Sequence, residues 1–443
     1  MTSRKVIIPF FTAGIGRHAS TRAARIILSI FALAALLCHV RPALATTYYV
    51  SATGKDSNIG TSATAPFLTI AKAANLTKPG DIVNVMNGTY GPFTISRSGS
   101  PTGGYITYQA YSGQHPTILK NSSDWNGILI ADSTSYIVVQ GFTVLGNAQS
   151  ITVSQAQSAP DNNFTTNGNC IGGHSSVHHV KIFNNTVSYC PEAGIMFTGD
   201  YVWIYRNVIH HNAFWSPYAA SGITVQGANS DASTATKIFV YNNLVYNNQN
   251  YICNKYQTNP CEITDGMGII LDNNITYGYT GRTKIYNNII YNNGGPAISA
   301  NHSQHVDIVN NTTYKNNLSA TEPAPFTEHP YGGEITLLNS SDARVLNNIN
   351  YGSSSVQMFF GSLSSVPNLV WDYNILFNGI GAAPRGPHDL AVNPLFVSSP
   401  PFNFHLQPGS PAIGSGTSML APPYDFDGNL RLAGSVDRGA YRR

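Results

Sequence analysis

The chain has 443 residues, of which only 10% are charged, and it contains 40 glycines and 25 tyrosines. This composition suits many short β-strands joined by polar turns. It does not favour a helical protein, and no polybasic run suited to nucleic acid or to an anionic membrane surface remains once the first 45 residues are set aside.

Those first 45 residues differ from the rest of the chain. They contain six basic residues and no acidic one, an apolar run at 26–40, and the small-x-small pattern Ala43-Leu44-Ala45. A bilayer span needs about 20 apolar residues, so a membrane anchor is the weaker alternative. The pattern predicts a signal peptide over 1–45 and a secreted protein, extracellular or periplasmic. Its removal changes the net charge from +3 to −3, because 18 basic residues then face 21 acidic ones.

The mature chain opens with a strand at 48–50 and a short amphipathic helix around 67–75. Pro79-Gly80 ends that helix, and 81–86 reads as another strand. We expect the helix to cover the end of a β-structure, because an exposed edge presents unpaired backbone groups.

A signature of two asparagines returns along the middle of the chain, each time after a short apolar strand. The copies are HVKIFNN, KIFVYNN, RTKIYNN, HVDIVNN and ARVLNN, and YVWIYRN is a sixth in which Arg206 replaces one asparagine. The second asparagines are Asn185, Asn207, Asn243, Asn288, Asn311 and Asn348. Their spacings of 22, 36, 45, 23 and 37 residues fit one or two coils of a parallel β-solenoid, some with loops.

Alternation within each copy predicts which side chains point inward. Val180 and Ile182 occupy alternate positions, as do Val306 and Ile308, so we expect these residues in the core and their neighbours outside. The asparagines mark the turn that follows. They could form a binding surface, but a structural ladder is favoured, because asparagine tolerates a left-handed backbone and bonds its counterpart in the next coil.

A second series of strands follows about ten residues after each asparagine pair, at 194–199, 222–227, 268–273, 296–301 and 333–338. In each strand we expect the isoleucine and the apolar residue two positions later to point inward. The outward partners should then stack into a column of Thr198, Gln226, Asp272, Asn301 and Leu338.

Four cysteines remain after the signal peptide, an even number that favours disulfides in an exported chain. Cys253 and Cys261 bracket a short loop, and Cys170 and Cys190 lie 20 residues apart, close to one coil. We expect each pair to bond. A zinc site is the alternative, but neither spacing matches one.

These features resemble the right-handed parallel β-helix proteins of the pectate-lyase-like superfamily. The resemblance rests on the entry YYVSATGKDSNIGTSATAPFLTIAKA, on the asparagine-pair coils, and on the exit NPLF…FHLQPGSPAIGSGT. It implies an all-β solenoid over 46–387 with an N-terminal capping helix, followed by an irregular capping tail at 388–443. Because this superfamily hosts many reactions, function has to be argued from the site.

Acidic residues gather between 229 and 273. Asp231, Asp265 and Asp272 are expected on adjacent coils, where three carboxylates would suit Ca²⁺. The alternative is that Asp231 and Asp265 only cap turns. Gly386-Pro387-His388-Asp389 is similar to a motif of mannuronan epimerases, but its first Asp is absent, so we interpret it as a loop.

Basic residues are expected beside these acids. Removal of the proton next to a uronate carboxylate needs that carboxylate neutralised and a base available. We predict Lys284 as the base with Arg282 holding the substrate, and Lys255 as the substitute base. His302 could assist proton transfer. Each could instead be an ordinary surface residue.

Outward aromatic residues could bind sugar rings. Trp203, Tyr241 and Tyr286 are expected to line the substrate groove together with Gln226 and Asn301, although the same aromatics also fit lateral packing.

The sequence therefore predicts a secreted, monomeric polysaccharide lyase that cleaves an acidic, uronic-acid-containing polysaccharide with help from Ca²⁺. An inverting glycoside hydrolase using two of the three aspartates is one alternative. A non-catalytic carbohydrate-binding solenoid is the other, and it is favoured if the acids and Lys284 lie on different faces.

Overall fold

The computed structural model describes residues 45–443 except 122, 161, 219, 256–262, 319–331, 360–364 and 399. The predicted signal peptide lies almost wholly outside the described residues. Within the described part of the chain, no helix is long and apolar enough to span a membrane.

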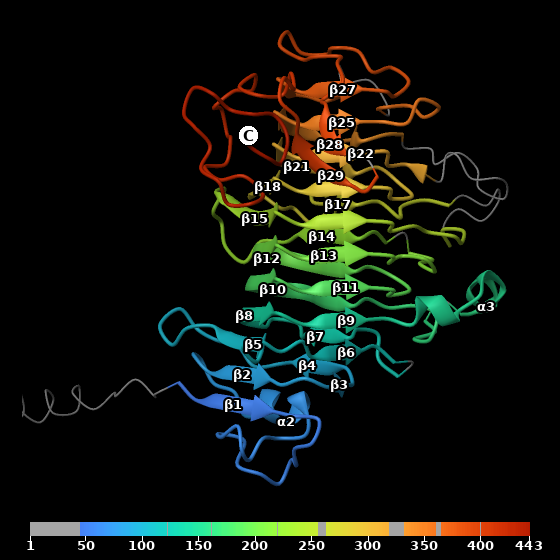
Figure 1. Ribbon diagram of the computed structural model, residues 1–443. Helices are drawn as coiled ribbons and strands as arrows, with labels where there is room; N and C mark the ends of the chain where they lie inside the picture. The colour runs from blue at the N-terminus through green and yellow to red at the C-terminus, as the bar shows by residue number, and fades with distance from the viewer. Residues whose placement is uncertain are drawn as a thin grey trace, which may run out of the picture. The chain divides into compact units, whose positions relative to one another are not determined.

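The chain winds into coils that stack from the N-terminal end to the C-terminal end (Figure 1). Each coil contributes strands to three faces, and the strands of every face pair in parallel with the equivalent strands of neighbouring coils. Faces 1 and 2 are joined into one sheet, because β10 and β12 run across both. This is a parallel β-helix, as the sequence predicts.

The strands divide among the faces as follows. Face 1 consists of β4 (Phe93–Ile95), β7 (Ile128–Ile130), the first parts of β10 (Ile171–Phe183) and β12 (Ile195–Tyr205), β14 (Ile223–Gly227), β17 (Ile269–Asp272), β20 (Ile298–Asn301) and β23 (Ile335–Leu338). Face 2 consists of β1 (Thr47–Val50), β2 (Ile82–Val85), β5 (Ile106–Ala110), β8 (Ser135–Gln140), the second parts of β10 and β12, β15 (Thr236–Tyr241), β18 (Arg282–Tyr286), β21 (Gln304–Val309), β24 (Ser341–Leu346) and β26 (Val370–Asp372). Face 3 consists of β3 (Thr89–Tyr90), β6 (Thr117–Leu119), β9 (Thr143–Leu145), β11 (Thr186–Ser188), β13 (Val208–His210), β16 (Leu244–Tyr246), β19 (Ile289–Tyr291), β22 (Thr312–Tyr314), β25 (Ile349–Tyr351) and β27 (Ile375–Phe377).

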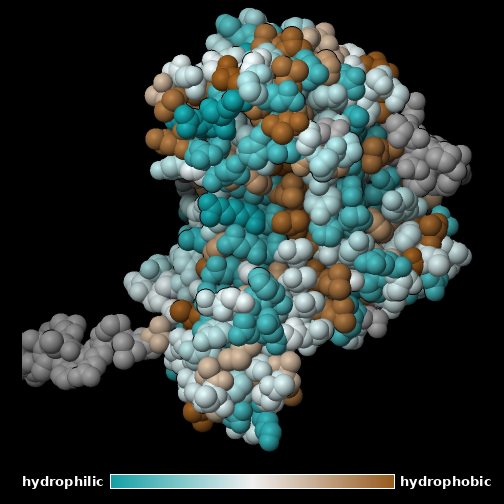
Figure 2. Space-filling model, in the orientation of Figure 1, coloured by the Kyte–Doolittle hydropathy of each residue, from teal (hydrophilic) through white to brown (hydrophobic). Residues whose placement is uncertain are grey.

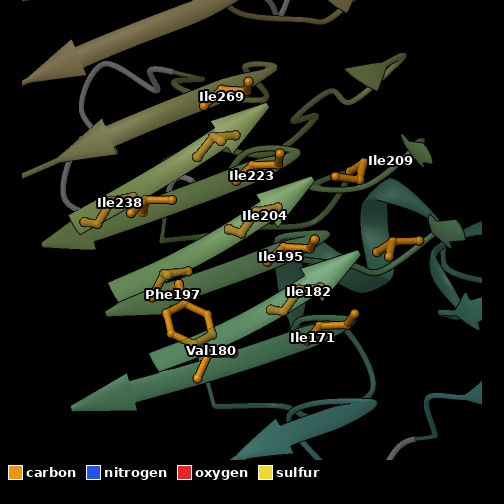
Figure 3. Close-up of a cluster of buried hydrophobic side chains, with 14 of the residues drawn as sticks. Ile171, Val180, Ile182, Ile195, Phe197, Ile204, Ile209, Ile223, Ile238 and Ile269 are labelled. Carbon is orange, nitrogen blue, oxygen red and sulfur yellow. The ribbon is translucent and has the colours of Figure 1, made fainter. Parts of the chain in front are cut away.

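The core fills the inside of the coils with stacked aliphatic side chains. Val180, Ile182, Ile195 and Phe197 are fully buried and lie among further isoleucines of neighbouring coils (Figure 3). Val306 and Ile308 are also fully buried. The predicted alternation is confirmed, because each inward residue has an outward neighbour that is more exposed or packs on another surface.

The two asparagines of each pair have different structural roles. The first asparagine takes the left-handed backbone of the turn from face 2 to face 3, with φ of 53° at Asn242 and at Asn287. The second builds the predicted ladder. Both the backbone N–H and the side-chain amide of Asn243 donate to Asn288 Oδ1, each at 3.0 Å. The same pair of bonds repeats from Asn185 to Asn374, so the structural ladder is confirmed.

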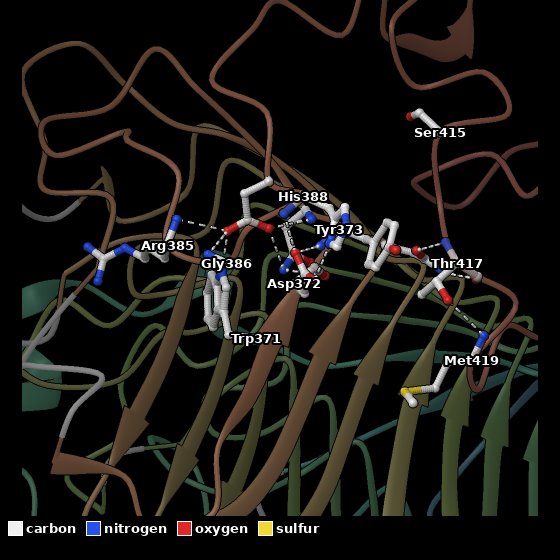
Figure 4. Close-up of polar contacts among 12 residues, drawn as sticks. Trp371, Asp372, Tyr373, Arg385, Gly386, His388, Ser415, Thr417 and Met419 are labelled. Carbon is white, nitrogen blue, oxygen red and sulfur yellow. Dashed lines mark hydrogen bonds and ion pairs between the residues drawn. The ribbon is translucent and has the colours of Figure 1, made fainter.

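The ladder ends on a carboxylate. Asn374 N donates to Asp389 Oδ1 at 2.7 Å. Trp371 Nε1 and the backbone N–H groups of Arg385 and Gly386 also donate to Asp389, and Figure 4 shows these three residues converging on one carboxylate. In the same close-up His388 reaches Asp372, with 2.7 Å between Nδ1 and Oδ2. The segment Gly386–Asp389 therefore terminates the ladder, in agreement with its interpretation as a loop.

A second ladder, which the sequence analysis missed, follows the strands of face 3. It runs through Asn212, Asn248, Asn293 and Asn316 and ends on Glu334, whose carboxylate accepts Asn316 N at 3.0 Å and Asn316 Nδ2 at 2.8 Å. Its signal was present in the sequence, because each member stands five residues after a member of the first ladder. Burial raises the pKa of Glu334 to about 7.

Helix α2 (Ile70–Ala74) is capped by Thr69, whose side chain accepts the Lys72 N–H. It packs beside β1, β2 and β4 near the N-terminal end, where a covering helix was predicted. The disulfide between Cys170 and Cys190 is confirmed. Cys253 is also disulfide-bonded, but its predicted partner, Cys261, lies outside the described residues.

The C-terminal segment 388–443 packs along the side of the last coils. The antiparallel hairpin of β28 (Phe396–Ser398) and β29 (Asn403–Leu406) brings Phe396 and Phe404 against Ile349 and Ile375 of face 3. In the space-filling view, hydrophobic residues form a broken column up the middle of the visible side (Figure 2). The segment docks through the turns as well, since Asn287 Nδ2 donates to Tyr424 O at 2.7 Å and Asn347 Nδ2 to Thr417 O at 2.8 Å.

Candidate active site on face 1

Four connections from face 3 to face 1 are long loops, and they stand along one edge of face 1. We call residues 120–127, 146–170, 211–222 and 247–268 the loop wall; residues 122, 161, 219 and 256–262 are not described. The wall packs on itself, because Gly222 N donates to Met267 O and Gly266 N to Ala220 O. Face 1 is thus a strip of outward side chains with a wall beside it.

Polar residues of consecutive coils form a continuous stripe on this face. Thr198 pairs in register with Gln226, and its hydroxyl donates to Gln226 Oε1 at 3.1 Å. Gln226 Nε2 lies 3.5 Å from Asp272 Oδ2. Asn301 Nδ2 donates to Asp272 Oδ1 at 2.9 Å. The predicted column is confirmed, and the inward residues of the same strands appear as Ile195, Ile223 and Ile269 in Figure 3.

His302 extends the stripe to the turn that leaves face 1. Its Nδ1 lies 3.2 Å from Asn301 Oδ1, and the residue has a φ of 43°. Four residues proposed from sequence, Gln226, Asp272, Asn301 and His302, therefore meet on one surface.

Asp265 is a buried residue of the loop wall that lies within electrostatic reach of Asp272. It is 8% exposed and has a left-handed backbone, with φ of 69°. Burial raises the pKa of Asp265 well above its usual range, and the negative charge of Asp272 raises it further. Asp265 therefore keeps its proton at a pH where an ordinary aspartate has lost it.

Asp272 has the opposite surroundings. It is half-buried at the end of β17, and its oxygens accept amide N–H groups from Asn273 at 2.7 Å and Asn301 at 2.9 Å. A carboxyl group whose raised pKa retains its proton and a second carboxyl group that accepts amide N–H groups are suited to act as an acid and a base.

The loop wall also carries aromatic and basic groups. The Trp125 ring meets Phe164 and Tyr218 edge-on, with ring centroids 5.6 Å and 6.1 Å away. Lys255 Nζ lies 3.9 Å from the centre of the Tyr218 ring. A pocket of about 290 Å³ opens in this part of the wall, lined by Lys255, Asn167 and Trp215 among others. The substitute base of the sequence analysis thus lies at the wall beside face 1.

Two buried ionisable groups near this wall were not singled out from sequence. Burial raises the pKa of Glu192 to about 7, and its Oε2 has no hydrogen-bond partner among the described residues. Burial lowers the pKa of Lys120 to about 8, and its Nζ donates to Phe164 O at 2.8 Å. Sequence alone gave no signal for either, because their perturbation comes from loops distant in the chain.

The predicted catalytic pair Lys284 and Arg282 is placed wrongly. Both lie on β18, which belongs to face 2, whereas Asp272 lies on face 1. Lys284 Nζ donates to Leu420 O of the C-terminal segment at 2.8 Å. Arg282 is bound by two carboxylates, with NH1 2.9 Å from Asp307 and NH2 2.5 Å from Asp342. Neither side chain faces the acidic residues it was predicted to serve.

The predicted three-aspartate metal site is also not formed. Asp231 Oδ1 lies 3.0 Å from Lys237 Nζ, and Tyr201 donates to Asp231 Oδ2 at 2.7 Å. The hydrogen bond from Tyr201, followed by that from Lys237, lowers the pKa of Asp231 to about 2. No group of three or more His, Cys, Asp or Glu among the described residues could hold a metal ion. Calcium dependence stays a prediction without an assigned site.

The predicted aromatic platform fails for a geometric reason. Tyr241 stacks on Tyr205 at 4.8 Å and on Tyr286 at 4.7 Å, with ring planes within 4°. Trp203 likewise stacks on Phe239 at 5.8 Å. Because neighbouring coils occupy the ring faces, Trp203, Tyr241 and Tyr286 pack laterally on face 2 and do not offer open faces to a sugar on face 1.

Known structures resemble this architecture. Pectate lyase Pel9A aligns over 91% of this chain and 98% of its own, at 18% identity and a TM-score of 0.53. XylC in complex with xylose covers 89% of this chain and 98% of its own, at 13% identity and a TM-score of 0.45. The GH136 lacto-N-biosidase from Eubacterium ramulus covers 81% of this chain and 60% of its own, at 15% identity and a TM-score of 0.43.

No protein-family model and no curated protein matches the chain. The likeness to Pel9A nevertheless agrees with the parallel faces and stacked coils described above. The chain is a right-handed parallel β-helix protein.

Proposed function

We propose that this protein is a secreted glycoside hydrolase that binds an extended polysaccharide along face 1 and cleaves it between Asp265 and Asp272. Two aspartates carry the proposal. Asp265 is buried and has a raised pKa, and Asp272, on the stripe of polar side chains, accepts an amide N–H group from Asn301. Asp265 would protonate the leaving oxygen, and Asp272 would act as base or nucleophile.

The stripe accounts for substrate binding. Thr198, Gln226, Asp272 and Asn301 occupy successive coils, so their side chains repeat at about the 4.8 Å spacing of neighbouring strands. Such a row presents hydrogen-bonding groups along a line, which suits the hydroxyl groups of an extended glycan. The Trp125 and Tyr218 rings of the loop wall add apolar surface beside it.

β-Elimination on a uronic-acid-containing polysaccharide is the second candidate, favoured by Lys255. This lysine lies at the loop wall over Tyr218. Its ammonium form could neutralise a uronate carboxylate, whereas only its neutral amine could serve as base. This candidate no longer includes Lys284 or Arg282, and Ca²⁺ would then have to be recruited with help from the substrate.

The test is digestion of a panel of acidic and neutral polysaccharides by the purified mature protein. Hydrolysis yields new reducing ends without the ultraviolet absorbance of an unsaturated uronate, whereas elimination yields both. We expect Asp272→Asn and Asp265→Asn each to lower kcat by at least about a hundredfold, as expected for loss of acid–base catalysis. Lys284→Ala is the matched control and should retain full turnover.

Three results would overturn the proposal. Full activity of Asp272→Asn would remove the acid–base pair. Unsaturated products that disappear in Lys255→Ala would establish the elimination candidate instead. Binding without any cleavage across the panel would support the non-catalytic solenoid. If hydrolysis is observed, NMR of the first-formed anomer distinguishes inversion from retention.

A further inference from the structure

Arg206 is the residue at which the asparagine repeat breaks. It occupies the first position of its pair and has a φ of 54°, like Asn184 at 55° and Asn242 at 53°. Asparagine is enriched several-fold in this left-handed region, whereas arginine gains nothing there. A residue kept at a backbone position that its type disfavours is a reason to look for a function.

The first asparagines of the following coils hold the C-terminal segment. Asn242 donates to Phe426 O at 3.1 Å, Asn287 to Tyr424 O, and Asn310 to Asp437 O at 2.9 Å. Arg206 lies one coil before Asn242, at the edge of this docked segment. Among the described residues, no ion pair or side-chain hydrogen bond engages its guanidinium. Its side chain is exposed.

Two hollows are lined by Arg206, and residues 422–428 contribute to both. One has a volume of about 360 Å³ and is lined by Arg206, Tyr241, Tyr286, Pro422 and Pro423 among others. The second shares Arg206 and continues past Val208, Leu244 and Phe426. A volume of this order is at the lower end of the range for small-ligand sites, which is about 300–1,000 Å³.

The acidic residues of these hollows are already engaged. Asp425 accepts the backbone N–H groups of Asn429 at 2.7 Å and Arg442 at 2.8 Å. Asp427 lies 2.8 Å from His405 Nε2. Arg206 is therefore the cation left to meet a ligand, and a guanidinium matches a carboxylate with two parallel hydrogen bonds.

We propose that Arg206 and the hollow beside residues 422–424 bind a carboxylate-bearing sugar unit, at a site separate from face 1. Arg206 holds the carboxylate, while the tyrosine edges and the two prolines contact the ring. The site lies at the turns between faces 2 and 3, so a glycan held there leaves face 1 open. The proposal does not depend on which reaction face 1 performs.

The test follows the Arg206 side chain itself. In an Asp272→Asn background, which prevents turnover, arginine Nε–Hε NMR signals are recorded during titration with trigalacturonate or with its carboxyl-reduced form. The Arg206 signal is assigned by its loss in Arg206→Asn. We expect a saturable shift of that signal with the charged trisaccharide and no shift with the reduced one. The Lys315→Asn variant should show the same shift of the Arg206 signal. Lys315 is the matched control, because it is another cation at a left-handed position, with φ of 48°.

Stability separates this role from a structural one. Arg206→Asn restores the residue of the other copies, so we expect an unchanged or higher melting temperature. A lower melting temperature would show that Arg206 holds the docked segment and would overturn the proposal. An unmoved Arg206 signal, or equal shifts with both trisaccharides, would overturn it too, whether or not Asp272→Asn abolishes cleavage.

Discussion

Replacing Asn185 by Ala should destabilise the protein far more than replacing its neighbour Asn184 by Gly. Asn185 Oδ1 accepts the buried backbone N–H of Phe142 at 3.0 Å, and its Nδ2 donates to Val139 O at 3.2 Å and to Asn207 Oδ1 at 3.1 Å. Truncation strands one buried N–H, worth about 1–3 kcal/mol, and removes two further bonds worth about 0.5–1.5 kcal/mol each. We therefore expect a loss of about 3 kcal/mol.

Asn184 is exposed and serves the turn through its φ of 55°. Glycine adopts this conformation freely, so Asn184→Gly should change the free energy of unfolding by less than about 1 kcal/mol. Urea denaturation followed by circular dichroism measures both variants against the parent protein. Equal losses in the two variants would refute the division of labour within the asparagine pair.

Three further predictions concern ionisable groups. If Asp265 is the acid, kcat should fall as pH rises through its raised pKa, and that alkaline limb should vanish in the residual activity of Asp265→Asn; a limb that persists would assign it elsewhere. Asp200→Asn should lower the melting temperature more than Asp231→Asn, because the fully buried Lys237 then keeps only the half-exposed carboxylate of Asp231 at 3.0 Å and loses the buried carboxylate of Asp200 at 2.8 Å; equal losses in the two variants would contradict this. Burial raises the pKa of Glu334 from 4.5 to about 7, so the folded state holds this proton more tightly than the unfolded state does. The free energy of unfolding should therefore fall as pH rises from about 4.5 to about 7. Melting curves of Glu334→Gln should lack this part of the pH dependence, and an unchanged profile would contradict the assignment.

The fold could be predicted because the spacing and the internal pattern of the repeat determine the geometry of a coil. A period near 22 residues sets the coil, alternation as in Val180 and Ile182 sets inside against outside, and a recurring Asn-Asn sets the turn. The stripe from Thr198 to Asn301 followed from the same register. Even the second ladder was accessible, since its members keep a constant offset from the first.

The candidate site was harder to predict than the fold, because alternation identifies the outward residues but not the face on which each of them lies. Residues 273–281 carry the chain from face 1 to face 2, so Arg282 and Lys284 leave the surface on which Asp272 lies. The raised pKa values of Asp265 and Glu192 were equally inaccessible, because they depend on loops that fold over them from distant parts of the chain. The aromatic stripe was identified correctly as outward, but stacking between coils uses the ring faces.

The docking of the C-terminal segment changes how the solenoid holds together. In a bare stack of coils each coil contacts only its neighbours, so stability propagates step by step and either end can fray. Here one segment is bonded to the turns at Asn242, Asn287, Asn310 and Asn347, which belong to four successive coils. Opening any one of these coils strains the attachment of the others. The C-terminal half of the stack is thereby expected to unfold as one cooperative block, while the coils before Asn242 keep the graded behaviour of an ordinary repeat protein.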